Sequence, residues 1–148
     1  MEGLLTGLSR PLPVVLIVAT VLSANAAFSD LPEQEVRRAI ADGVKLFEAE
    51  NLPRLMAMVS DSYRSGPMTK EAIRLQLLGI FQANRELHVT LKIREIRLRG
   101  DLVFVRFGGQ VTGQPLLWPY RVVIFEWQDL VEVGRREGTV WRLYGDQQ

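Results

Sequence analysis

The sequence has no cysteine, a single histidine and almost no excess of either charge. The missing cysteine excludes disulfides, thiolate zinc sites, iron–sulfur clusters and a cysteine nucleophile. The 18 lysines and arginines balance 17 acidic residues and are interspersed with them, whereas nucleic-acid binders gather a basic excess into a stripe. One histidine leaves a metal site short of nitrogen ligands, and no spaced carboxylate cluster replaces them. We therefore expect no cofactor, no metal and no nucleic-acid partner.

The chain also lacks an apolar run long enough to span a membrane. The run near the N-terminus covers residues 12–22, and a spanning helix needs about 20 apolar residues. Small residues follow it, and Ala24-Asn25-Ala26 fits the step at which signal peptides are cleaved. This predicts a cleaved secretory signal peptide over residues 1–26 and a single domain over 27–148, periplasmic or secreted. The alternative is an uncleaved leader that tethers the same domain; in the cleaved form we expect membrane contact only through the leader, during export.

The first half of this domain has the sequence pattern of helices. Apolar residues recur every three to four positions from Val36 to Phe47, which predicts an amphipathic helix. Asn51 is placed to cap a short second helix, and Thr69 is placed to cap a third.

From Glu86 onward the apolar period changes to two, which is typical of strands. A shift in this alternation predicts a bulge near Arg94-Glu95, and Gly108-Gly109 predicts a kink or a close backbone approach. The third expected strand, residues 118–133, would extend about 53 Å at ~3.3 Å per residue. Because that is too long for a straight strand in this domain, we expect a bend or bulge at Gln128-Asp129.

Three stretches resemble the nuclear transport factor 2-like superfamily, which includes ketosteroid isomerase-like and polyketide-cyclase-like domains. They are a helix pair with a Ser-x-x-Tyr corner at residues 46–63, the strand start at 100–105, and a closing Trp-Arg-Leu strand within 138–146. The resemblance implies an α+β fold with three N-terminal helices packed on a strongly bent antiparallel sheet, a cone-like, cystatin-like roll. It also implies an apolar pocket at the open end, which enzymes of this fold line with an acid or a histidine.

Alternation along the third strand predicts which of its residues point inward. Arg121 and Asp129 share the expected buried face, and a buried charge is costly unless it is paired or opens into a cavity. Both are therefore candidate pocket residues, and Asp129 is the candidate acid, although a bulge at Gln128-Asp129 would turn it outward. The other members of that face are Val123, Phe125, Trp127, Val131 and Val133; the outer face holds Tyr120, Val122, Ile124, Glu126, Leu130 and Glu132.

Aromatic residues supply the other pocket candidates. Tyr63 either packs in the core or lines the pocket mouth, and Tyr120 is placed to rim an opening. Phe107 and Trp127 are large inward residues that could plug the pocket. The only histidine, His88, is expected on the surface, because it alternates with apolar neighbours.

Three functions fit these patterns. The leading interpretation is an exported domain that binds a small apolar molecule or a protein partner and performs no chemistry. The second is an isomerase or dehydratase acting on a hydrophobic carbonyl compound, with Asp129 as proton acceptor and Tyr63 or Tyr120 as hydrogen-bond donor. The third is a homodimer formed through the outer sheet face, with Val122, Ile124 and Leu130.

Overall fold

The structure, a computed structural model, describes residues 31–148. The predicted signal peptide, residues 1–26, lies outside this range, as does the start of the predicted domain. Three helices precede an antiparallel sheet with the strand order β3-β4-β5-β6. The elements are α1 (Leu31–Glu48), α2 (Leu52–Ala57), β1 (Arg64–Ser65), β2 (Met68–Thr69), α3 (Lys70–Ala83), β3 (Asn84–Arg99), β4 (Leu102–Pro115), β5 (Val122–Glu137) and β6 (Val140–Leu143).

Side-chain caps begin the second and third helices, as predicted. The Asn51 side chain accepts a hydrogen bond from the Arg54 amide at 3.2 Å. Thr69 Oγ1 accepts one from the Ala72 amide, also at 3.2 Å. Each cap satisfies an amide that the first helical turn leaves unpaired.

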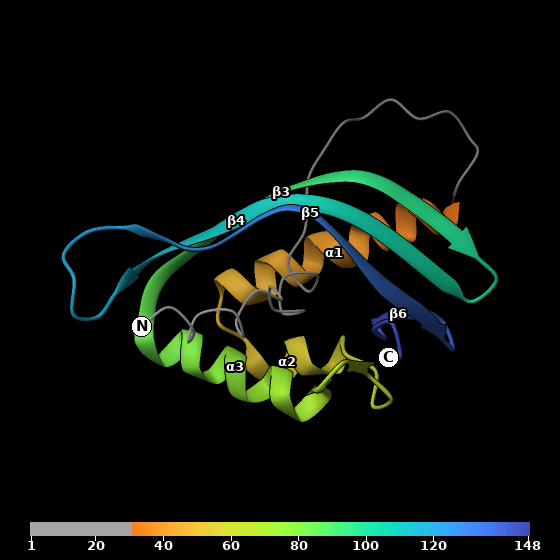
Figure 1. Ribbon diagram of the computed structural model, residues 1–148, viewed down its shortest axis with the longest axis horizontal. Helices are drawn as coiled ribbons and strands as arrows, with labels where there is room; N and C mark the ends of the chain where they lie inside the picture. Colours follow the sequence, from red (N-terminus) through yellow and green to blue (C-terminus); the bar gives the residue numbers. More distant parts are fainter. Residues whose placement is uncertain (1–30) are drawn as a thin grey trace, which may run out of the picture.

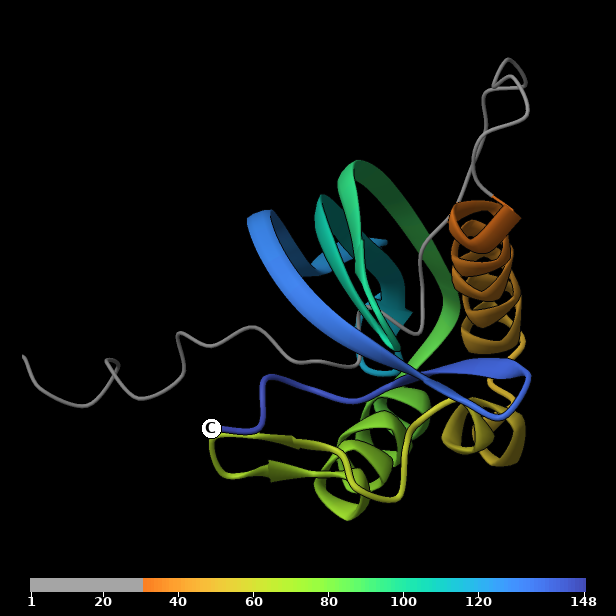
Figure 2. The same ribbon diagram turned by 90° about the vertical axis from the view of Figure 1, so that its right-hand side faces the viewer.

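The sheet curls over the helices, which all lie on its concave side (Figures 1 and 2). Two predicted irregularities produce part of this curl. The β3–β4 register shifts between Ile93 and Glu95, and the β4–β5 register shifts between the Phe107–Leu130 and Gly109–Trp127 pairs. The second shift inserts Gln128-Asp129 opposite a single β4 residue, which confirms the expected bulge.

The core fills the space between the helices and the concave face. From α1, Phe47 meets Phe81 of α3 edge to face, with ring centroids 5.3 Å apart. The sheet contributes buried side chains from the first half of β3, from most of the length of β4 and from the middle of β5. The core residues closest to complete burial are Phe47, Leu55, Val59, Ile73, Leu77, Val105, Phe107 and Val111.

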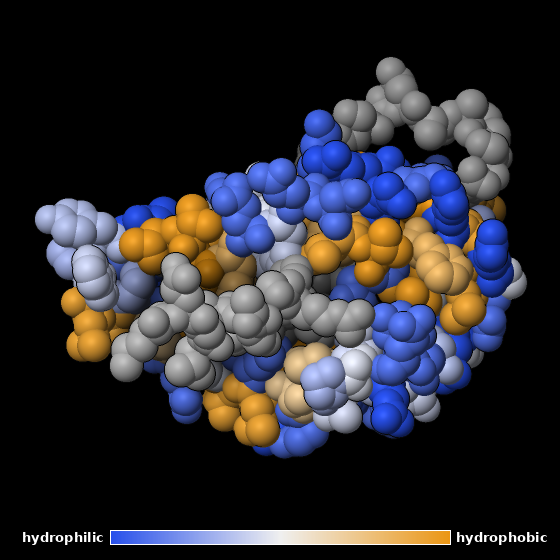
Figure 3. Space-filling view, viewed as in Figure 1, coloured by the Kyte–Doolittle hydropathy of each residue, from blue (hydrophilic) through white to orange (hydrophobic). Residues whose placement is uncertain are grey.

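The segment between β4 and β5 differs from the prediction. The third long strand was expected to begin near Trp118, but residues 116–121 form a loop and β5 begins at Val122. Pro119 lacks an amide to donate to a strand ladder, which disfavours continuous pairing here. The resulting hairpin projects beyond the helices (Figure 1), and apolar side chains gather at this end of the molecule (Figure 3).

No helix between residues 31 and 148 is both long and apolar enough to cross a membrane.

Candidate functional site

Two bulges in β5 change which of its side chains face the core. Besides the predicted bulge, the register also shifts between Val111 and Thr112 of β4. Val111 pairs with Phe125 and Thr112 pairs with Val123, so Ile124 is an extra residue in β5. Each bulge moves the alternation by one residue.

The face predicted for several β5 residues is therefore wrong. Val123 and Val131 are at least half exposed instead of buried, and Ile124 and Leu130 pack against the core instead of facing outward. The homodimer face predicted through Val122, Ile124 and Leu130 thus loses two of its three residues, while dimerisation itself stays a prediction.

Asp129 does not lie in the interior. The predicted bulge turns it outward, where its side chain is 54% exposed and its Oδ2 lies 3.7 Å from Arg106 Nη1. Arg106 also lies 3.8 Å from a carboxylate oxygen of Glu95. Asp129 therefore belongs to a surface cluster of opposite charges and does not face the interior. The enzymatic hypothesis loses the acid on which it was built.

Arg121 is also exposed, contrary to the predicted buried face. Its guanidinium donates to the Glu86 backbone oxygen at 3.0 Å and to Thr112 Oγ1 at 3.2 Å, and lies 3.6 Å from the Glu86 carboxylate. Tyr120 is 69% exposed on the loop. Arg121 thus holds the base of the projecting hairpin through its hydrogen bonds, and Tyr120 lies beside it on the loop.

The three remaining aromatic candidates are buried. Phe107 and Trp127 belong to the core cluster on the concave face, and whether they plug a pocket stays a prediction. Tyr63 also belongs to the core cluster, and it borders a wide polar groove of about 820 Å³ between the β1–β2 hairpin and α3. His88 is exposed, as predicted, and its Nδ1 lies 2.6 Å from Glu48 Oε2.

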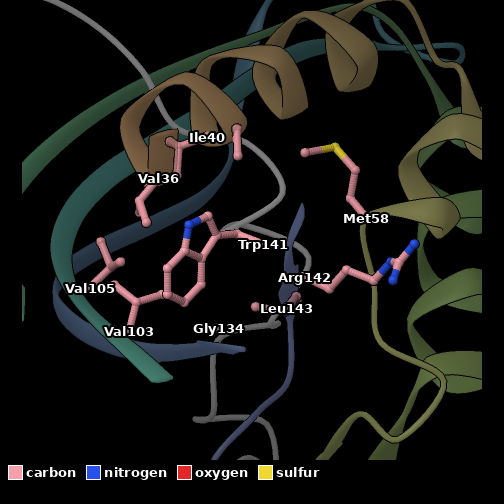
Figure 4. A pocket seen from close by; sticks show the side chains of 10 residues that line it. Val36, Ile40, Met58, Val103, Val105, Gly134, Trp141, Arg142 and Leu143 are labelled. Carbon is pink, nitrogen blue, oxygen red and sulfur yellow. The ribbon is translucent and has the colours of Figure 1, made fainter. Parts of the chain in front are cut away.

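An apolar cavity of about 40 Å³ lies between α1 and the strands β4, β5 and β6 (Figure 4). Met58, just after α2, closes one side of it. Outward from the cavity runs a groove of about 430 Å³, which shares Ala39, Met58, Trp141 and Arg142 with it. The cavity walls come from Val36, Ile40, Val103, Val105, Gly134 and Leu143, and the groove adds Glu35, Arg38, Asp42 and Thr139.

Trp141 forms part of the wall between the cavity and the groove. Its indole Nε1 is buried and has no hydrogen-bond partner among the described residues. Figure 4 shows the nitrogen edge of the ring turned toward α1. A buried donor without an acceptor costs about 1–3 kcal/mol, so an oxygen brought there by a ligand would remove an existing penalty. The sequence predicted only that Trp141 is part of a closing strand. Whether its N–H has a hydrogen-bond partner depends on the residues that surround it in the folded chain.

The concave face also carries one carboxylate that the alternation placed on the wrong side. Glu132 pairs directly with Val105, whose side chain is buried. Directly opposite residues of an antiparallel pair point to the same face. Glu132 therefore faces the concave side, next to the strand positions that line the cavity, and it is partly buried.

No sequence profile of a known family matches the chain, and no curated protein is similar to it in sequence. Solved structures do match its fold. A candidate scytalone dehydratase from Novosphingobium aromaticivorans superposes with a TM-score of 0.64 at 12% identity, over 75% of this chain and 78% of that chain. A candidate dehydratase of the nuclear transport factor 2-like family from Streptomyces avermitilis gives 0.62 at 12%, over 76% and 91%. A protein of that family with a cystatin-like fold, also from N. aromaticivorans, gives 0.58 at 16%, over 75% and 76%.

This chain has the nuclear transport factor 2-like fold. The resemblance drawn from its helix pair and closing strand is thereby confirmed at the level of fold, and so is the predicted α+β roll. Because the identities are this low, the likeness establishes architecture and leaves the chemistry to the residues themselves.

A polar network ties the helices to the closing hairpin of the nuclear transport factor 2-like fold. Glu137 accepts hydrogen bonds from Ser60 Oγ at 2.6 Å, from Arg135 at 2.5 Å and from Arg142 at 3.2 Å. Ser60 is almost fully buried. These hydrogen bonds hold the pKa of Glu137 below its ordinary value. The Ser60 hydroxyl has the largest effect, and the guanidiniums of Arg135 and Arg142 add to it. Arg142 also donates to the Ala57 backbone oxygen at 3.1 Å, so the network links the end of α2 to β5 and β6 and has a structural role.

Replacing Glu137 by glutamine should lower the free energy of unfolding by about 1–2 kcal/mol at pH 7. A lowered folded-state pKa gives stability that is complete above the ordinary pKa of 4.5 and is lost as the pH falls through the folded value. The difference between wild type and Glu137→Gln, from urea titrations at several pH values, should therefore shrink on acidification below about 4.5.

Exposed Glu126, which has no ion pair among the described residues, provides the matched control Glu126→Gln. Asp61 and Glu71 also have lowered pKa values, through hydrogen bonds from Lys70 and Arg74. Both are present in wild type and variant, so their effect cancels in the difference. A difference that stays constant from neutral to acid pH would show that the network does not depend on the Glu137 charge.

Proposed function

We propose that this chain binds a small amphipathic molecule at the junction of α1 and β6, with a hydrogen-bond acceptor on the ligand facing Trp141. The observation that carries the proposal is the buried indole N–H without a partner beside an apolar cavity. Binding sites for small molecules are mostly apolar and hold a few polar groups that fix the ligand's orientation. The arrangement here has that composition.

The two parts of the site define the class of ligand. The cavity holds only a few heavy atoms, and its walls are almost entirely aliphatic or aromatic. The groove is larger and carries charges of both signs, from Glu35, Arg38, Asp42 and Arg142. A compound with a compact apolar end and a polar remainder therefore fits better than a uniformly apolar one.

The proposed setting is the periplasm or the extracellular space, because residues 1–26 have the pattern of a secretory leader. This part of the proposal requires a mature chain that begins at Ala27.

Acid–base chemistry on the bound molecule is the second candidate function. Two of the structural neighbours carry the word dehydratase in their names, and the register places the Glu132 carboxylate on the concave face. Glu132 would take the role that the sequence assigned to Asp129. Time-dependent conversion of a bound carbonyl compound by wild type, absent in Glu132→Gln, would favour this candidate over binding alone.

A pair of compounds that differ by one carbonyl tests the binding site. We suggest 1-indanone and indane, with both dissociation constants measured by ligand-observed NMR. In wild type, indane should have the higher dissociation constant. In Trp141→Phe the ratio of the indane to the indanone dissociation constant should fall by a measurable factor of up to about ten, because one hydrogen bond of about 1 kcal/mol is lost. Affinity for indane itself should change little, since phenylalanine keeps an aromatic wall.

Trp118→Phe is the matched control, because it makes the same chemical change at an exposed indole far from the cavity walls. Its ratio should equal that of wild type. An unchanged ratio in Trp141→Phe, or absence of binding by both compounds to wild type, would contradict the proposed site.

A further inference from the structure

The loop between β4 and β5 presents an unusual cluster of apolar side chains. Leu116, Leu117, Trp118 and Tyr120 are all more than half exposed, and Leu117 is 94% exposed. They lie at the end of a hairpin that projects along the long axis, away from the helices (Figures 1 and 3). We name residues 116–120 the apolar tip.

The composition of the apolar tip matches that of segments lying at a membrane surface. Leucine side chains partition into the acyl region, and tryptophan and tyrosine prefer the level of the lipid head groups. A short projecting tip can reach that depth without bringing the rest of the domain into the bilayer.

The apolar tip is fastened to the domain at its base. The Leu116 amide donates to the Ala83 backbone oxygen at 3.0 Å, and the Trp118 amide donates to the Pro115 oxygen at 3.1 Å. Arg121 fixes the other end through its hydrogen bonds to Glu86 and Thr112. Because the loop is held in this way, the exposure of its side chains belongs to the folded state.

The charges around the apolar tip suit an anionic surface. No acidic residue occurs between Asp101 and Glu126. At the base, Arg121 is balanced by Glu86, while Arg85 is exposed and makes no ion pair with residues 31–148. The surplus is one positive charge, which adds a modest attraction to anionic head groups.

The apolar tip is too small to support a stable dimer by itself. Four side chains of this size bury at most a few hundred Å², whereas a stable protein interface buries about 800 Å² on each partner. Insertion into lipid has no such area requirement, because each apolar side chain gains by leaving water.

We propose that the apolar tip inserts into the head-group region of a lipid bilayer and docks the domain on the membrane through residues 116–120. The sequence led us to expect membrane contact only through the leader; this contact is a second one, made by the folded domain. It is independent of the ligand proposed at Trp141.

Quenching of tryptophan fluorescence by brominated lipid tests the insertion at Trp118, which lies in the apolar tip. The full chain is mixed with vesicles of phosphatidylcholine and phosphatidylglycerol, with brominated or ordinary acyl chains. Wild type should be quenched and Trp118→Phe should not, since Trp127 is buried and Trp141 is partly covered. This readout is specific to the tip even where the leader is still attached.

Leu117→Asp should weaken the quenching, with the lipid concentration for half-maximal effect raised about tenfold or more. Leu75→Asp is the matched control, because Leu75 is an exposed leucine on α3, and it should behave as wild type. Equal quenching in wild type and Trp118→Phe would overturn the proposal. So would a dimer in light scattering that Leu117→Asp dissociates, because a second copy would then cover the tip.

Discussion

Replacing Gly109 by alanine is expected to lower the free energy of unfolding by about 3 kcal/mol. A Cβ at this position would lie 2.3 Å from the Thr90 backbone oxygen and 2.9 Å from two carbons of the Leu91 side chain. The first contact is with the backbone of the neighbouring strand, so a change of rotamer cannot relieve it. The β3–β4 ladder would have to shift at the centre of the sheet, and urea denaturation followed by circular dichroism would measure the loss.

Gly79→Ala is the control for this substitution. Gly79 lies inside α3, and a Cβ there would meet nothing within 4 Å. Alanine at this position should stabilise the protein by about 0.5–1 kcal/mol, because it restricts the unfolded chain and favours the helix. Equal effects of the two substitutions would show that strands β3 and β4 do not approach each other this closely at Gly109.

The bends of the sheet could be predicted where the sequence marks them locally. Gly108-Gly109 interrupts a run of large residues, and Gln128-Asp129 interrupts a run of apolar ones, so both stood out. The bulge at Ile124 could not be found in this way, because residues 122–125 are all apolar and give no alternation to interrupt. Its position depends on pairing with β4, which is a non-local property.

The errors in the candidate site follow from the bulges. Once Ile124 and Gln128-Asp129 are inserted, the β5 side chains beyond each bulge exchange faces. Asp129 therefore moves to the surface beside Arg106, and Glu132 moves to the concave side. Asp129 was chosen as the candidate acid from its residue type and its expected face, but the face depends on the register, which is set by pairing with β4.

Trp141 illustrates a different limit of the sequence. Its place in a closing strand was expected from the resemblance, but a hydrogen-bond partner could have come from any neighbouring element. Only the packing of α1 against β6 shows that no described residue provides one. An unsatisfied donor is a property of the whole environment, and no motif encodes it.

Phe107→Ala should cost about 3–5 kcal/mol of unfolding free energy, the usual range for removing a buried aromatic ring. Phe107 is fully buried and pairs with Ile93 on one side and Leu130 on the other. Removing the ring leaves a void at the centre of the concave face, which the paired strands cannot close without breaking their ladders. Thermal and urea unfolding would measure the loss, and Phe107→Leu, which keeps most of the volume, should cost clearly less.

The same variant decides whether Phe107 plugs a pocket or only fills the core. An apolar cavity of the size of a lost ring stays dry and can bind benzene. Benzene should therefore raise the melting temperature of Phe107→Ala and leave that of wild type unchanged, because a ligand that binds only the folded state stabilises it. A loss below about 1 kcal/mol, with no response to benzene, would mean that the concave face collapses around the missing ring. In that case the space available to a ligand would be confined to the cavity beside Trp141.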